Sequence, residues 1–96
     1  MKQEFIGVTS IKQSNETINN FMKTSDVDYF ENEIALQKAV DFTKSLGFVF
    51  DIDDCEACIS GNELEPANIS VIADTTKEAT FLALETFAKL KNNNRI

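Results

Sequence analysis

Residues 69–91 read ISVIADTTKEATFLALETFAKLK and decide most of the fold. The first five, from Ile69 to Ala73, are mainly apolar and β-branched, which is typical of a short strand. Thr75 and Glu78 have the spacing of a capping box, in which the threonine hydroxyl accepts a hydrogen bond from a backbone N–H of the first helical turn. Apolar side chains then recur every three or four residues. This stretch therefore predicts a strand that leads directly into a C-terminal amphipathic helix.

Upstream of this unit, residues 30–46 carry apolar side chains at helical spacing, and Gly47 follows where a helix commonly ends. Residues 48–53, FVFDID, change to the two-residue period of a strand. We expect Phe48, Phe50 and Ile52 on its buried face and Asp51 and Asp53 on an acidic face. Residues 55–60 are predicted to form a second strand, which ends at the turn Gly61-Asn62.

Short connections join the three predicted strands, so neighbouring strands are expected to run antiparallel. The sequence predicts an α+β domain with a small antiparallel sheet of three or four strands packed with two main helices. The core order is helix, strand, strand, strand, helix.

Both ends of the chain are expected to add little to this core. Residues 1–29 are predicted to form a smaller extension, with a strand over residues 4–11 and a short helix capped by Ser14 or Asn15. Residues 92–96 are polar and read as a frayed tail.

The 96 residues of the chain suffice for one acidic domain, residues 1–96, and for little more. No apolar run approaches the roughly 20 residues of a membrane helix. The first residues, MKQEFIGVTSIKQ, lack the apolar core of a secretory signal, so a cytoplasmic location is expected. The chain contains no histidine, which removes every Ser-His or Cys-His catalytic arrangement. We therefore expect a protein that is not an enzyme and that binds no cofactor.

Cys55 and Cys58 form a single CxxC motif, which is a weak signal for a metal or redox site. A structural zinc site needs four ligands, and this chain offers no histidine and no second cysteine pair. Acidic neighbours such as Asp54 and Glu56 raise the pKa of a thiol and so suppress the reactive thiolate. A metal or redox module, or a metal shared between two chains, remains an alternative.

The charge distribution is the most informative functional feature. The chain carries a net charge of −7, and residues 26–65 contain eleven acidic residues against two lysines, a net charge of −9. Nucleic acid and membranes are therefore not expected to bind directly, whereas a basic protein surface would be attracted. An ordinary solvated acidic face that keeps the protein soluble is the competing interpretation.

The last third of the chain resembles the closing strand–helix unit of small phage-encoded α–β–α sandwich domains. Ala73, Thr75, Glu78 and Ala79 match the A-x-T-x-x-E-A turn between strand and helix in those domains. The resemblance covers residues 30–91 in outline. It implies a phage or mobile-element origin, a location in the host cytoplasm, and a role as an anti-CRISPR or anti-restriction inhibitor of host defence.

These observations lead to one functional hypothesis, namely an acidic inhibitor that occupies the basic surface of a nucleic-acid-processing enzyme. Tyr29 is expected to be an exposed apolar anchor for binding. The expected partner-binding residues are Asp26, Asp28, Tyr29, Glu31, Glu33, Asp51, Asp53, Asp54, Glu56, Glu63 and Glu65. An immunity protein against a basic nuclease toxin would use the same physics and is the first alternative. The broad apolar faces of both main helices also leave room for a homodimer.

Overall fold

The computed structural model describes residues 8–61, 64 and 68–96. These residues form three helices and a three-stranded antiparallel sheet in the order helix, helix, strand, strand, strand, helix. The bounds are α1 Val8–Met22, α2 Glu33–Ser45, β2 Val49–Asp53, β3 Glu56–Ser60, β4 Ile69–Ile72 and α3 Thr76–Asn92. The predicted α+β class and the helix–strand–strand–strand–helix core are therefore confirmed, and α1 is added before them.

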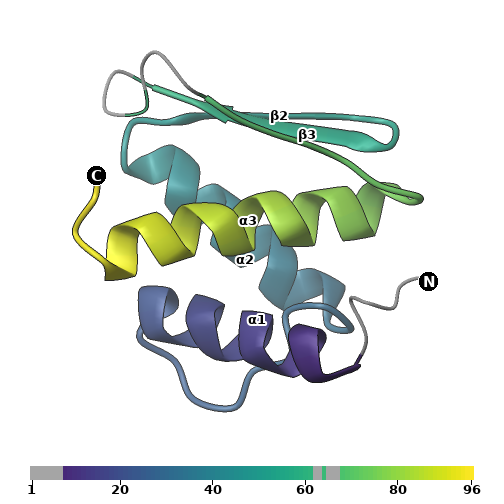
Figure 1. Cartoon of the computed structure of the whole chain (residues 1–96), viewed down its shortest axis with the longest axis vertical. Helices are drawn as coiled ribbons and strands as arrows, with labels where there is room; N and C mark the ends of the chain where they lie inside the picture. The colour runs from purple at the N-terminus through teal and green to yellow at the C-terminus, as the bar shows by residue number, and fades with distance from the viewer. Residues whose placement is uncertain (1–7, 62–63, 65–67) are drawn as a thin grey trace.

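The elements form layers, with the sheet outermost and all three helices on the same side of it (Figure 1). The strand order is β2-β3-β4, and both pairs run antiparallel as their short connections require. Helix α3 crosses the molecule between the sheet and α1, while α2 lies behind it and leads into β2 (Figure 1). One face of the sheet is thus covered by helices, and no described element covers the other.

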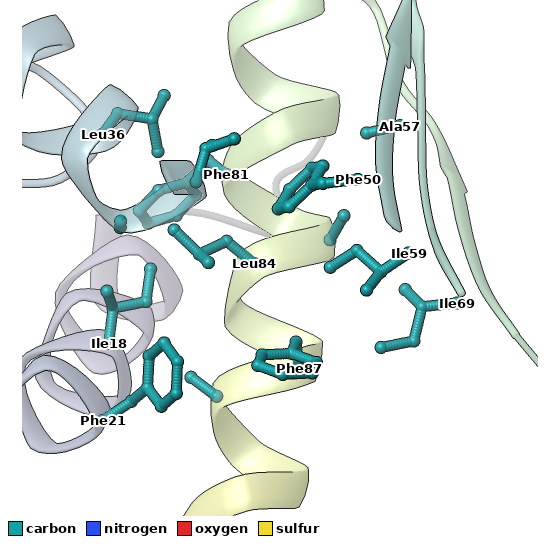
Figure 2. Packing of buried hydrophobic residues seen from close by; sticks show 14 of the residues in the cluster. Ile18, Phe21, Leu36, Phe50, Ala57, Ile59, Ile69, Phe81, Leu84 and Phe87 are labelled. Atoms are coloured by element: carbon teal, nitrogen blue, oxygen red, sulfur yellow. The ribbon is translucent and has the colours of Figure 1, made fainter. Parts of the chain in front are cut away.

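The core is centred on α3, whose Phe81, Leu84 and Phe87 are all buried. Figure 2 shows Phe50, Ile59 and Ile69 reaching α3 from the sheet, and Ile18 and Phe21 reaching it from the opposite side. Aromatic rings meet edge to face in this core, for example Phe48 with Phe87 at 4.8 Å between ring centroids. A helix with apolar residues around most of its circumference needs neighbours on both sides, and the fold supplies them.

The ends of the two later helices follow the sequence signals closely. Asn32 caps α2 by accepting a hydrogen bond from the Ala35 N–H at 3.0 Å, so α2 begins three residues later than expected. Gly47, at φ +99°, ends the helix in the conformation that favours glycine. Thr75 caps α3 as predicted, but the Glu78 carboxylate accepts from the Asp74 N–H rather than from that of Thr75. The capping box is therefore only half formed.

The predicted N-terminal helix is confirmed as part of α1, but the strand and the cap predicted before it are wrong for the described residues. Val8–Ile11 is the first turn of α1 rather than part of a strand, while residues 4–7 lie outside the described part of the chain. Ser14 and Asn15 lie inside α1 and cap nothing, because the helix begins several residues earlier. Since Ile18 of α1 is fully buried, this helix belongs to the core and is no peripheral extension.

The C-terminal tail is also held in place. The Asn92 side chain donates to the Thr17 carbonyl at 3.0 Å, and the Arg95 N–H donates to the Leu90 carbonyl at 2.9 Å. Ile96 packs against the core. These contacts replace the expected frayed end with a turn fixed to α1 and α3.

Candidate functional site

The candidate site is the face of the sheet that no described helix covers, called the outer face below. In the antiparallel register Asp51 lies opposite Cys58, Asp53 opposite Glu56, and Glu56 opposite Ile72. Residues directly opposite one another share a face, and alternate residues along a strand return to it. The outer face therefore consists of Val49, Asp51, Asp53, Glu56, Cys58, Ser60, Ser70 and Ile72.

The charge of the outer face has one sign. Its charged members are Asp51, Asp53 and Glu56, and no lysine or arginine is among the residues that the register places there. Asp53 and Glu56 lie directly opposite each other, where like charges destabilise a sheet. Sheet stability alone therefore does not account for the acids on this face.

The turn between β2 and β3 extends the acidic surface. Asp54 occupies this turn at φ +54°, a conformation that aspartate adopts more readily than most residues. The Thr76 hydroxyl donates to the Asp54 carbonyl, and the Ala73 N–H donates to the Cys55 carbonyl at 2.9 Å. The hairpin is thus fixed to the start of α3 and presents its acids from a rigid support.

Asp74 adds a further exposed acid beside the hairpin, which sequence reasoning missed. The Cys55 thiol lies 3.4 Å from the Asp74 carbonyl and contacts the Asp54 carboxylate at 3.9 Å. Desolvation first, and the Asp54 charge second, raise the pKa of Cys55. The antiparallel order could have indicated this proximity, because the end of β4 must lie beside the β2–β3 turn.

The acids of residues 26–33 have local structural tasks instead. Asp28 accepts three hydrogen bonds, from the Asn15 side chain at 3.0 Å and from the N–H groups of Phe30 and Glu31 at 3.1 Å each. The Glu31 N–H contributes most to lowering the pKa of the Asp28 carboxyl. Glu33 lies in the first turn of α2, where the helix dipole favours an acid. Asp26 is exposed at φ +58° in the same connection.

Tyr29 is not the exposed anchor that the sequence predicted. Its side chain is 2% exposed, and its hydroxyl lies 2.8 Å from the Thr24 hydroxyl. The Tyr29 N–H donates to the Asn15 side chain at 2.8 Å. The expectation was wrong because α1 is longer than predicted. Asparagines of α1 bond to the backbone of the α1–α2 connection, and the Tyr29 ring is thereby directed into the core.

The two acidic segments converge at one end of the molecule. Thr76 contacts Asp54, and the next residue, Lys77, lies 3.9 Å from the Glu31 carboxylate. The β2–β3 turn and the starts of α2 and α3 all lie at the same end in Figure 1. The remaining predicted acids, Glu63 and Glu65, lie outside the described residues.

The outer face also exposes apolar side chains that sequence reasoning did not single out. Val49 is 53% exposed and Ile72 is 77% exposed. Ile52 points to the inner face, yet it is 40% exposed rather than buried as expected, because it lies on an edge strand. Protein interfaces combine exposed apolar residues at their centres with polar and charged residues at their rims, and the outer face offers both kinds.

The two cysteines have separate surroundings. The Cys58 thiol lies on the outer face, 3.5 Å from the Ser70 hydroxyl, whereas that of Cys55 is beside the β4–α3 junction. Among the described residues, no three side chains of the types that ligate metals gather closely enough to hold an ion. The described helices also include none that is long and apolar enough to cross a membrane.

Comparison of the chain with protein families, with curated proteins and with solved structures finds no match. The resemblance to phage-encoded domains therefore stays a prediction, and the function is argued from the geometry of the outer face.

Proposed function

We propose that this protein is a non-enzymatic inhibitor that places the outer face of its sheet against a basic surface of a nucleic-acid-processing defence complex. The observation that carries the proposal is that Asp51, Asp53 and Glu56 share the outer face, which no described helix covers and to which the register brings no basic residue. Asp54 and Asp74 extend this surface at the hairpin end.

Unfavourable electrostatics within the site support the proposal. Glu56 accepts a hydrogen bond from the Ser70 hydroxyl at 3.4 Å, but Asp53, directly opposite Glu56, is a like charge that destabilises the sheet, so its presence is better explained by an external partner than by the fold. A row of carboxylates on a fixed support resembles the phosphate charges that a basic groove is built to bind, and it also accelerates association. Val49 and Ile72 supply the apolar area that charged contacts alone do not.

The acids of residues 26–33 have a secondary part in this proposal. Asp28 is occupied by hydrogen bonds within the fold, and Glu31 lies near Lys77. Their charge adds to the acidic end of the molecule at long range, while direct contact with the partner is assigned to the outer face.

A pull-down from a bacterial lysate treated with nuclease tests the proposal. The bait is compared with Asp51→Lys/Asp53→Lys and with a matched control, Glu16→Lys/Asp41→Lys, which changes the net charge equally at exposed positions on α1 and α2. We expect a nucleic-acid-binding protein that both the original chain and the control retain. The outer-face variant, raised salt and added competitor DNA should each release it. Identical captures by the two variants would refute the proposal.

The same experiment separates the alternatives. A captured nuclease toxin would assign the protein as an immunity protein, which uses the same surface. Capture that persists at high salt would place the binding surface on an apolar helix face instead. Loss of capture with Cys55→Ser or Cys58→Ser, but not with the outer-face variant, would point to the cysteines.

A further inference from the structure

The outer-face acids Asp51 and Asp53 belong to β2, which is an edge strand of the sheet that the described residues form. Within the described part of the chain, β2 pairs with β3 alone. The pairing closes on Asp53 and Glu56 across a two-residue turn, so Val49, Asp51 and Asp53 exchange hydrogen bonds with β3. The N–H and C=O groups of Phe50 and Ile52 therefore point away from β3, towards the unpaired edge.

The exposed large apolar side chains are concentrated in the part of the chain that leads into and forms this edge strand. Six large apolar residues of the described chain are exposed, and five of them lie in α2, in the turn after it or in β2, namely Ile34, Phe42, Leu46, Val49 and Ile52. Ile52 is the most informative of them. Its side chain lies on the inner face of the sheet, and a strand added beside β2 would cover the part that is still exposed. The opposite edge strand, β4, carries no acid.

A second copy of this chain fits the β2 edge poorly. Two β2 strands paired with each other would bring Asp51 and Asp53 against the same residues of the other copy, and like charges on paired strands repel. In the described sheet, the β2 edge thus has backbone groups available for hydrogen bonding. Its negative charge repels a second β2 strand and attracts a basic one.

We infer that β2 accepts an extended segment of a basic protein as an added antiparallel strand, in which apolar residues alternate with lysine or arginine. Residues opposite Phe50 and Ile52 share the inner face, so apolar side chains there cover Ile52 and hydrogen-bond to the free edge. Residues opposite Asp51 and Asp53 fall in the closely spaced non-hydrogen-bonded pairs, where basic side chains meet the carboxylates. This inference rests on the proposed function and specifies how its partner binds.

Synthetic peptides test the inference without knowledge of the partner. The probe is a nine-residue peptide in which lysine and valine alternate. Two matched peptides carry backbone N-methyl groups on all valines or on all lysines, so that charge and composition stay comparable. In the antiparallel arrangement the valine N–H groups bond to β2, whereas the lysine N–H groups point away. Valine methylation should therefore weaken binding by about tenfold or more, and lysine methylation should leave it nearly unchanged.

Amide hydrogen exchange on the full chain supplies a second readout. Binding of the unmethylated peptide should slow exchange of the Ile52 N–H by about tenfold or more, while the Asp51 N–H, already bonded to β3, should change little. Asp51→Asn/Asp53→Asn should weaken the same peptide, and Glu16→Gln/Asp41→Asn should not.

Three results would overturn the inference. Equal binding of all three peptides, with Ile52 exchange unchanged, would show that charge alone drives docking and would leave the proposed function standing. Greater loss on lysine methylation would exclude the antiparallel arrangement. Absence of binding by every peptide would exclude strand addition, and the lysate comparison of charge-reversed variants would still decide the proposed function separately.

Discussion

The two acidic segments, residues 26–33 and residues 51–56, look alike in the sequence and behave differently in the structure. In the first, Asp28 accepts hydrogen bonds from three donors and Tyr29 is buried. In the second, Asp51 and Asp53 face solvent, and Asp53 lies opposite another acid. The first segment uses Asp28 to shape a connection. In the second, the Glu56 carboxylate accepts a hydrogen bond from the Ser70 hydroxyl at 3.4 Å, whereas Asp51 and Asp53 have no such task among the described residues. Function is therefore better sought in the second.

The largest expected contrast is between Tyr29, a buried residue of the first segment, and Val49, an exposed apolar residue of β2, the strand that carries Asp51 and Asp53 of the second. Tyr29→Ala should lower the free energy of unfolding by about 3–5 kcal/mol, because it empties a fully packed site. Val49→Ala on the outer face should change it by less than about 0.5 kcal/mol. Urea unfolding followed by circular dichroism measures both. Similar losses for the two variants would mean that Val49 of β2 contributes as much to the packed core as Tyr29 does.

A smaller contrast is expected between the acids themselves. Asp28→Ala removes the acceptor of the Phe30 and Glu31 N–H groups and should cost about 1–2 kcal/mol, as the loss of a capping residue does. Asp51→Ala should be neutral within about 0.5 kcal/mol. Asp28→Asn keeps the accepting oxygen and serves as the control, since it should recover most of the loss. If Asp51→Ala lowered the free energy of unfolding as much as Asp28→Ala, the Asp51 side chain would be shown to stabilise the fold.

The hairpin acids should even oppose stability. Asp53→Lys replaces a like-charge pair with an opposite-charge pair across from Glu56 and should raise the free energy of unfolding by roughly 0.2–1 kcal/mol. The gain should shrink at high salt, because both groups are close to solvent. The double change Asp53→Lys/Glu56→Lys, which restores a like-charge pair, should cancel the gain. A destabilised Asp53→Lys would remove one argument for an external partner.

Local signals predicted most of the sheet and its helices. Alternation in residues 48–53 placed Asp51 and Asp53 on the same face, and Thr75 and Gly47 marked helix boundaries correctly. The burial of Tyr29 could not be predicted in this way. It depends on Asn15 and Asn19, which lie a helix away in the sequence and hold the connection through side-chain hydrogen bonds to its backbone.

Long-range placement explains the remaining differences. The proximity of Asp74 to Cys55 follows from the strand order, and that of Lys77 to Glu31 follows from the packing of α3 beside the start of α2. Periodicity alone determines neither. The exposure of Ile52 follows from the edge position of β2 for the same reason. The sequence therefore predicted the acidic face but not that β2, which carries Asp51 and Asp53, is an edge strand of the described sheet.

The pH dependence of stability offers the subtlest distinction between the segments. The Glu31 N–H and the other donors lower the pKa of the Asp28 carboxyl below its value of 3.8 in a model compound. A carboxyl whose pKa is lower in the folded state stabilises the fold above its unfolded pKa and loses that contribution as pH falls through the folded pKa. The free energy of unfolding should therefore decline as the solution is acidified below about pH 4. Asp28→Asn should decline less steeply over this range. Urea titrations at several pH values provide the measurement.

Parallel curves of unfolding free energy against pH for the original chain and Asp28→Asn would mean that the hydrogen bonds to Asp28 do not favour its charged form. The contrast between the two acidic segments would then lose its electrostatic basis.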